Sequence, residues 1–440
     1  MSSTLRHIGP LFILALFCLY FFFAGLANPK DVWHRLTAQS HTPDFSHYTG
    51  PKTLSADHFP LDDPHRRVII LGDIHGMNEP FRALLDKLSY NPPSDVLIHV
   101  GDIIAKGPHE GSMAVLSFMA SHNITGVRGN HDQKVIEWRS WLAWIGQLDG
   151  GALWLRDFHA AAEAADPDDP EKWAARHIKR TRNKWRKRIP KGWKILSDHY
   201  RVARAMSEEE YKYLLALPLV LHVPSAHTLI AHAGVLPSDP RYKPYHRRQP
   251  LARIPSLPHD FDSDLDFTPD PSELRAYSHS EKTLPLLRRL QEAALLSEVP
   301  QNRDPWVTLN MRGILEDNTI TRAKDGEPWA ERWNAEMGMC GGFDRGHKHI
   351  HRAHREDALP CYPATVVYGH AASRGLDVKR WSVGLDSGCV SNRRLSALVL
   401  DSKSSSPSPA SKKSSIEARK KLGIPFGEEG RGLVVDVSCK

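Results

Sequence analysis

The chain is poor in cysteine and carries little excess charge of either sign. Five cysteines in 440 residues are too few for a protein held together mainly by disulfides. The 58 Lys and Arg against 51 Asp and Glu leave a net charge of +7, and 41% of residues are hydrophobic. This balance excludes a fully disordered chain, and the composition also excludes a polytopic membrane protein. The length predicts one large or two small domains.

A single apolar stretch near the N-terminus predicts attachment to a membrane. Residues 8–27 carry no charge and are dense in Leu and Phe, and a helix of about 20 apolar residues can span a bilayer. We expect a signal anchor formed by residues 1–27. The alternative is a signal peptide cleaved near the small residues 24–27, giving a secreted protein. Either interpretation puts residues 28–440 in a lumen or outside the cell.

The composition divides the remaining chain into three parts. Residues 28–65 are rich in Pro, His, Ser and Asp without periodicity, which predicts a linker. Residues 402–421 form a Ser/Pro/Lys tract, so residues 402–440 are expected to be a mostly disordered tail. The folded catalytic domain is therefore expected over residues 66–401.

Short apolar runs that end in polar, glycine-rich turns recur through this domain. Residues 68–71 and 96–100 read as buried strands, and helical spacing of apolar residues follows each of them. Further strand candidates lie near 124–127, 229–232, 365–370, 383–386 and 398–400. The repetition predicts an α/β layered fold with a site at the carboxyl ends of the strands.

These strand ends carry side chains that bind metals: Asp73, His75, Asp102, Asn130, His131, His232 and His370. A mixture of carboxylate, imidazole and amide oxygen suits Zn, Mn, Fe or Co better than Ca or a thiolate site. A single histidine of this kind is usually an ordinary loop residue. Three such motifs within 60 residues, each directly after a strand, predict a metal site.

In order along the chain, the motifs are GDIHG (72–76), GDIIAKGP (101–108), RGNHD (128–132), AHAG (231–234), YGH (368–370) and GLDSG (384–388). This set resembles the calcineurin-like metallophosphoesterase superfamily, and within it the phosphoprotein-phosphatase branch. The resemblance implies an αββα sandwich with a di-metal site, here preceded by one N-terminal transmembrane helix.

The second motif points to a subgroup. Protein phosphatases of this branch end it in Asp-Arg-Gly, whereas Lys106 is followed here by Gly-Pro. That ending resembles the diadenosine-tetraphosphatase-like group, whose fungal members include a membrane-anchored, zinc-dependent endopolyphosphatase of the vacuole. The expected function is therefore phosphoanhydride hydrolysis, with inorganic polyphosphate favoured. Symmetrical cleavage of diadenosine tetraphosphate, a phosphoprotein phosphatase, and an anchored polyanion-binding protein without activity remain alternatives.

The resemblance implies roles for the site residues. Asp73 and His75 would hold the first of two divalent metals, with Zn favoured. Asp102 would bridge both metals, and the second would be completed by Asn130, His232 and His370. A hydroxide bridging the metals would attack phosphorus.

His131 would then protonate the leaving oxygen, oriented by Asp132. The alternative for His131 is a structural role. Positive charge for the phosphate is expected from Lys106, Arg128, Arg312 and Arg374, for which surface salt bridges are the alternative.

Two insertions complete the prediction. In the first, about residues 155–210, the segment 172–194 holds 11 Lys and Arg and no acid. It is expected to guide a long polyanion, with a solvated basic helix or a lipid-headgroup surface as alternatives. The second, about 338–360, contains four histidines expected in an exposed loop (His347, His349, His351, His354). Cys340 and Cys361 could pair there, whereas Cys389 is expected as a small core residue. No nucleic-acid partner is expected, and the oligomeric state stays open.

Overall fold

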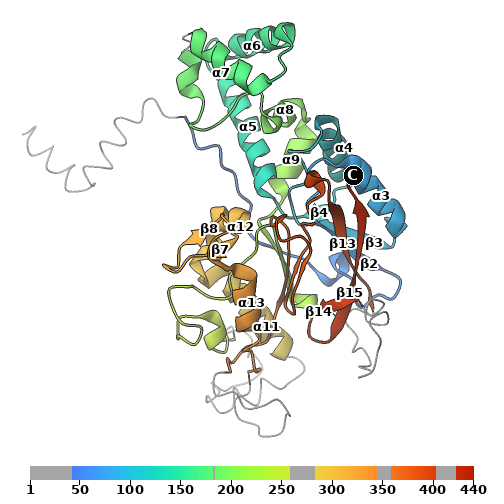
Figure 1. The fold of residues 1–440 in the computed structure, drawn as a ribbon. Helices are drawn as coiled ribbons and strands as arrows, with labels where there is room; N and C mark the ends of the chain where they lie inside the picture. The colour runs from blue at the N-terminus through green and yellow to red at the C-terminus, as the bar shows by residue number, and fades with distance from the viewer. Residues whose placement is uncertain (1–41, 182–183, 258–282, 344–357, 403–422) are drawn as a thin grey trace, which may run out of the picture. The chain divides into compact units, whose positions relative to one another are not determined.

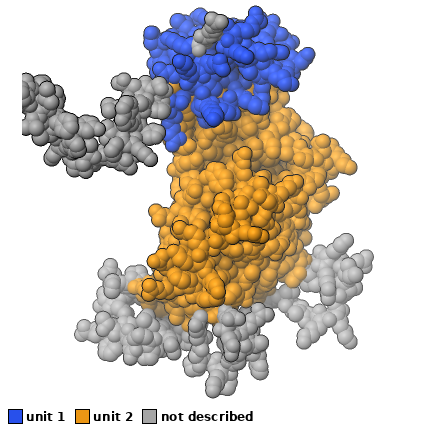
Figure 2. Space-filling model, turned by 60° about the vertical axis from the view of Figure 1, so that its left-hand side comes forward, with its two compact units in different colours: residues 1–44, 145–195 blue, residues 45–144, 196–440 orange. Residues whose placement is uncertain are grey.

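The computed structural model describes residues 42–181, 184–257, 283–343, 358–402 and 423–440. The chain divides into two compact units, coloured separately in Figure 2. Unit 1 comprises Met1–Asp44 and Ile145–Ile195, and unit 2 comprises Phe45–Trp144 and Leu196–Lys440. All the predicted metal ligands belong to unit 2.

The first sheet of unit 2 has six strands in the order β14-β15-β13-β2-β3-β4 (Figure 1). β2 runs parallel to β3, and β3 parallel to β4, whereas β13 is antiparallel to both β2 and β15. The bounds are β2 (Arg67–Leu71), β3 (Asp95–His99), β4 (Thr125–Gly126), β13 (Arg394–Leu400), β14 (Ile424–Phe426) and β15 (Gly430–Ser438).

The second sheet also has six strands, in the order β1-β5-β6-β10-β12-β11, and β6, β10 and β12 are parallel neighbours. Its strands are β1 (Lys52–Thr53), β5 (Val220–Val223), β6 (Thr228–Ala231), β10 (Thr365–Tyr368), β11 (Asp377–Val378) and β12 (Ser382–Gly384). A small third sheet pairs β7 (Gly313–Ile314) with β8 (Ile320–Thr321) and β9 (Glu327–Pro328).

Helices flank both large sheets. The first group is α3 (Asn78–Leu88), α4 (His109–Ser121), α5 (Asn130–Gln147), α8 (Asp198–Ala205) and α9 (Glu208–Ala216). The second is α11 (Thr283–Glu298), α12 (Pro305–Asn310) and α13 (Trp329–Met337). Short 3-10 turns are η2 (Ala56–His58), η4 (Pro224–Ala226), η5 (Pro250–Ala252), η7 (Pro300–Arg303) and η8 (Cys389–Ser391).

Two hydrophobic layers hold this arrangement together. Between the sheets, Val68 and Ile70 of β2 pack in one cluster with Ile230 of β6 and Val367 of β10. A second cluster joins the outer face of the second sheet to α11, α12 and α13, with Trp329 and Trp333 fully buried. On the other side, α3 lies against β13 and β15. The order helix, sheet, sheet, helix is the sandwich that the motifs predicted.

The structure corrects both ends of the predicted domain. Residues 42–65, within the expected linker 28–65, contribute β1 at the edge of the second sheet and buried Leu54, Phe59 and Leu61 in the core between the sheets. Within the expected tail 402–440, β14 and β15 complete the first sheet. In β15, Val434 packs against the core between the sheets, and the Ser/Pro/Lys tract ends before both strands.

Two disulfides join segments of unit 2. Cys340 is bonded to Cys361. Cys389 is buried in the core, as predicted, and is also bonded to Cys439 just after β15, a pairing that was not predicted. The partner lies in the segment that composition assigned to the tail, which is why the pair was missed.

Some predictions fall on residues outside the described ranges. They include the anchor at residues 8–27 and the four histidines of residues 347–354. Within the described ranges, no helix has both the length and the apolar character that crossing a membrane requires.

Unit 1 is helical over its described part. It contains the end of α5, then α6 (Gly151–Ala165), α7 (Pro170–Arg180) and η3 (Lys184–Arg188). Trp185 is buried and stacks on Trp154 with 5.5 Å between ring centroids. The Asp169 side chain caps α7 by accepting from the backbone N–H of Lys172. The predicted basic insertion, 155–210, therefore splits, because α8 and α9 belong to unit 2.

Candidate metal centre

Each predicted ligand follows a strand of one of the two large sheets. Asp73 and His75 follow β2, Asp102 follows β3, and Asn130 opens α5 shortly after β4; His232 and His370 follow β6 and β10. Because the parallel strands end at the same edge, side chains almost 300 residues apart meet, and the backbone N–H of His370 donates to Asp73 Oδ2 over 3.1 Å.

The ligand loops hold unusual backbone conformations. His75, Asp102 and His370 have φ of 50°, 50° and 66°, in the left-handed region that non-glycine residues rarely adopt. Close packing also requires glycine nearby: a Cβ at Gly129 would lie 2.1 Å from Asp102 Oδ1. Such strain, of order 1–3 kcal/mol per residue, persists where the surroundings fix it and is typical of functional sites.

Asp102 lies at the centre of the group. Its Oδ2 is 3.3 Å from His232 Nε2 and 3.6 Å from His75 Nε2. Two sets of ligand atoms, each within 4.8 Å of one another, share this carboxylate: Asp73, His75 and Asp102, and Asp102, His232 and His370. Asn130 Oδ1 adds to the second set, at 3.1 Å from His232 Nε2 and 2.9 Å from His370 Nδ1.

This donor set fits two divalent cations that share Asp102. Five of the six side chains are buried, so their carboxylate and imidazole groups need a partner other than bulk water. His75 Nδ1 is buried without a hydrogen-bond partner among the described residues. Oxygen and nitrogen donors of this mixture suit Zn, Mn, Fe or Co.

The electrostatics indicate a cation at the same place. Burial alone lowers the pKa of a histidine, yet Asp102 and then Asp73 raise the pKa of His232 to about 10. Conversely, burial would raise the pKa of Asp102, but His232 and His131 hold it well below its usual value. The carboxylate and the imidazole therefore stabilise each other's charge, and a metal bound to both would displace the proton of His232.

Of the predicted catalytic pair, His131 lies at the site, whereas Asp132 has a different set of contacts from the one predicted. His131 lies beside the ligands, with its ring 5.2 Å from that of His75, and its backbone N–H donates to Asp102 Oδ1. Asp132 does not orient it. The Asp132 carboxylate instead accepts from the backbone N–H groups of Asp102, Ile103 and Gly129, over 2.8, 3.1 and 2.9 Å. Asp132 thus shapes the two ligand loops.

The residue that contacts His131 was not predicted. His199, on the first turn of α8, places Nε2 2.7 Å from His131 Nδ1, and its own Nδ1 lies 2.6 Å from Asp198 Oδ1. No glycine-rich turn or strand end marks these residues. Asp386, of the GLDSG motif, was also missed; it is buried and its charge raises the pKa of Asp73, after the larger effect of burial.

The four predicted phosphate-binding cations separate into two groups. Arg312 donates from Nη2 to the His370 carbonyl over 3.0 Å, and Arg374 donates to the Arg312 carbonyl over 2.7 Å. Lys106 is exposed, and its charge adds to burial in lowering the pKa of His75 and of His131. These three lie at the site.

Arg128 is the exception, and its prediction as a substrate contact is wrong. The side chain is fully buried, and its guanidinium donates to the carbonyls of His47 and Leu215 and to Gln133 Oε1. Burial lowers the pKa of Arg128 to about 10. It therefore connects three backbone segments and does not face the ligands.

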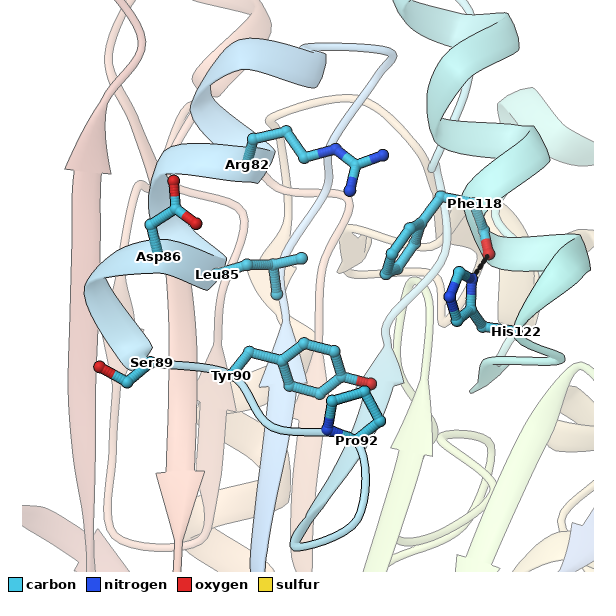
Figure 3. A pocket seen from close by; sticks show the side chains of 8 residues that line it. All are labelled: Arg82, Leu85, Asp86, Ser89, Tyr90, Pro92, Phe118 and His122. Atoms are coloured by element: carbon cyan, nitrogen blue, oxygen red, sulfur yellow. Dashed lines mark hydrogen bonds between the residues drawn. The ribbon is translucent and has the colours of Figure 1, made fainter.

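A separate hollow of about 410 Å³ lies between α3 and α4 (Figure 3). The Arg82 guanidinium lies 4.7 Å from the Phe118 ring centroid, and His122 stacks on the same ring. None of the metal ligands lines this hollow.

The chain is similar to several known proteins. Residues 66–251 match the family model described as calcineurin-like phosphoesterase. A symmetrical bis(5'-nucleosyl)-tetraphosphatase of Haemophilus ducreyi is 51% identical over 65 residues, which cover 14% of this chain and 23% of that protein. Serine/threonine-protein phosphatase 1 of Salmonella typhimurium is 36% identical over 75 residues, covering 17% and 34%. The chain thus spans about a quarter to a third of these relatives.

Among solved structures, one described as "a putative diadenosine tetraphosphatase" is 23% identical with a TM-score of 0.39, covering 80% of this chain and 94% of that one. The family match spans five of the six ligands, from Asp73 to His232, and the sixth, His370, meets them in space. The chain carries a calcineurin-like metallophosphoesterase domain.

Proposed function

We propose that the protein is a metal-dependent phosphoanhydride hydrolase and that inorganic polyphosphate, cut within the chain, is its preferred substrate. The main observation behind the proposed hydrolase activity is that two sets of ligand atoms share Asp102. Two divalent cations held there, with zinc favoured, supply Lewis acidity toward phosphate oxygens and water.

The protein's own groups have defined tasks around that centre. Asp73 and His75 would hold one cation, and Asn130, His232 and His370 would hold the other. Asp102 belongs to both sets of ligand atoms and would contribute to both positions. Arg312 and Lys106 offer positive charge to phosphate oxygens that the metals do not bind. His131 gives a proton to the oxygen that leaves phosphorus.

The choice of polyphosphate rests on charge. Segment 172–194 carries 11 cations, and Arg176, Lys179, Arg180, Lys187 and Lys191 are exposed. Clustered cations raise the local concentration of a polyanion. The names of the relatives favour a different substrate, because one is a dinucleoside tetraphosphatase and another a protein phosphatase. These remain the second and third candidates.

A direct comparison of substrates tests the proposal. The purified protein with Zn²⁺, Mn²⁺ or Co²⁺ should be given long-chain polyphosphate, diadenosine tetraphosphate and a phosphopeptide. Shortened chains with little free phosphate are expected, because a cut within the chain releases shorter chains and not orthophosphate. Consumption of the dinucleotide alone would make diadenosine tetraphosphate the substrate in place of polyphosphate, and the proposed hydrolase activity would stand. No consumption of any substrate would leave the polyanion-binding alternative.

The basic segment has its own test. Replacing Lys179, Arg180 and Lys187 by Gln should weaken use of long chains more than of short ones, since only a long chain reaches extra cations. The matched control replaces three exposed cations of unit 2, Lys52, Lys212 and Arg289. Equal loss on long and short chains, or equal loss in the control, would refute the guiding role.

We further propose a membrane-anchored protein whose catalytic domain faces a lumen, with the vacuole membrane favoured. The apolar residues 8–27 support the anchor, and two disulfides support an oxidising compartment. Microscopy of a tagged protein, with protease protection of the domain in sealed membranes, tests this. A fully secreted protein would favour the cleaved signal peptide.

A further inference from the structure

The geometry points to Asp198 and His199 as a positioning pair that orients His131 for proton transfer. We propose that the two residues fix the tautomer and direction of the His131 imidazole. This inference rests on the proposed function, in which His131 is the proton donor. Neither residue follows from the sequence motifs.

The contacts form an unbroken chain. Asp198 Oδ1 lies 2.6 Å from His199 Nδ1, and His199 Nε2 lies 2.7 Å from His131 Nδ1. The two imidazole planes are inclined by only 19°, with centroids 5.0 Å apart. Both distances lie in the range of strong, charge-assisted hydrogen bonds.

The carboxylate at the end of this chain is itself held on both oxygens. Asp198 Oδ1 also accepts from the His199 backbone N–H over 2.8 Å, and Oδ2 accepts from the Lys106 backbone N–H over 2.7 Å. Lys106 and the preceding Ala105 have φ of 68° and 67°, so the loop after Asp102 turns sharply where it meets Asp198. The pair is thereby tied to the loop that carries the shared ligand.

The capping and packing of helix α8 hold Asp198 and His199 in place. Ser197 caps the helix by accepting from the Tyr200 backbone N–H, and Tyr200 is fully buried against Trp138. Asp198 and His199 therefore occupy the first turn of a well-anchored helix. Rigid support of this kind keeps a catalytic group within the narrow geometry that proton transfer needs.

The hydrogen-bond chain leaves one ring nitrogen of His131 for the substrate. An ionised Asp198 can only accept, so His199 Nδ1 donates to it. The second hydrogen bond, between His199 Nε2 and His131 Nδ1, occupies the Nδ1 atom of His131. His131 Nε2 makes no hydrogen bond to any described residue, and the His131 ring lies nearly perpendicular to that of the ligand His75, with 5.2 Å between ring centroids.

The proposed step balances without any redox partner. As the P–O bond breaks, its electron pair stays on the leaving oxygen, which takes the proton from His131 Nε2. The His131–His199 pair thereby gives up one proton and keeps the hydrogen shared between His131 Nδ1 and His199 Nε2. Solvent returns the Nε2 proton before the next cycle.

A double-mutant cycle tests the pair on the full chain loaded with Mn²⁺. His199→Ala and Asp198→Asn should each lower kcat roughly ten- to hundredfold, as supporting residues of metal sites typically do, with KM little changed. His131→Ala should lose at least as much. In the His131→Ala background, removing His199 should cost no further activity, because His199 acts only through His131.

Three controls separate positioning from damage to the fold. Metal content and thermal unfolding should match wild type within error for His199→Ala, and the exposed His65→Ala should keep full kcat. Added imidazole should restore part of kcat to His199→Ala by occupying the vacated space. Additive losses in the double variant, or unchanged kcat in His199→Ala while His131→Ala is impaired, would overturn the pair. An unimpaired His131→Ala, or an inactive wild type, would instead overturn the proposed function and this inference with it.

Discussion

Asp102 Oδ2 lies 3.3 Å from His232 Nε2, a carboxylate and an imidazole from two different sheets. Among the described residues, Asp102 is the side chain that both sets of ligand atoms share. Its replacement should therefore disturb both positions at once.

Asp102→Asn should lower bound metal to one equivalent or less and reduce the rate of polyphosphate shortening by about a hundredfold or more, since loss of even a supporting residue costs 10–100-fold. Atomic absorption of the purified protein and gel electrophoresis of the polyphosphate chains measure the two effects. Asp86→Asn, on the exposed face of α3, is the matched control. Full activity of the Asp102 variant would contradict a di-metal reaction.

Arg128 allows a prediction that separates structure from substrate binding. Arg128→Ala removes donors from the carbonyls of His47 and Leu215 and leaves a cavity. Because an unpaired buried polar group costs about 1–3 kcal/mol and several are created, the free energy of unfolding should fall by about 3 kcal/mol or more.

Urea unfolding followed by circular dichroism measures this change, with Arg201→Ala on the exposed side of α8 as control. KM of the folded fraction should be unaffected. Unchanged stability together with a raised KM would restore the substrate role that the motif position predicted.

The metal ligands could be predicted because their chemistry and their position coincide in sequence. Asp73, Asp102 and His232 each come directly after an apolar strand, and parallel strands bring such positions to one edge. Side-chain direction is not encoded in this way. Arg128 precedes a ligand motif, yet its guanidinium points into the core. Asp132, similarly, holds backbone amides rather than His131.

His199 was missed for a different reason. It is separated from His131 by 68 residues and lies on a helix that composition grouped with the basic insertion. Nothing local distinguishes it from the other histidines of the chain, and only the packing of α8 beside the Asp102 loop brings the two rings together. Cys439 was missed because the tail predicted from the Ser/Pro/Lys tract was extended to residue 440.

The Cys389–Cys439 disulfide predicts a measurable contribution to stability. It closes 50 residues of chain and joins the end of β15 to the segment just after Asp386. Cys439→Ser should lower the free energy of unfolding by about 2–4 kcal/mol, the usual range for a native disulfide.

Denaturant unfolding of Cys439→Ser is compared with that of Cys340→Ser. The second variant removes the other disulfide, whose cysteines are 21 residues apart in sequence. In the chain-entropy account, the longer loop should have the larger effect. A reducing agent should destabilise wild type but should have a smaller effect on each variant. Equal stability of Cys439→Ser and wild type would show that this bond adds nothing to the native state.

Glu336 predicts a stability that depends on pH. It is buried on α13, where Oε1 accepts from Ser238 Oγ over 2.8 Å and Oε2 finds no hydrogen-bond partner among the described residues. Burial raises the pKa of Glu336 to about 7. Between its usual pKa and about 7, the folded protein binds more protons than the unfolded chain, so the free energy of unfolding falls as pH rises through this window.

Glu336→Gln removes the titration. The variant should gain on wild type by about 1–3 kcal/mol between pH 5 and pH 8. Thermal unfolding across this range measures the gain, with the exposed Glu209→Gln as control. A difference between variant and wild type that is constant with pH would mean that Glu336 stays ionised when buried.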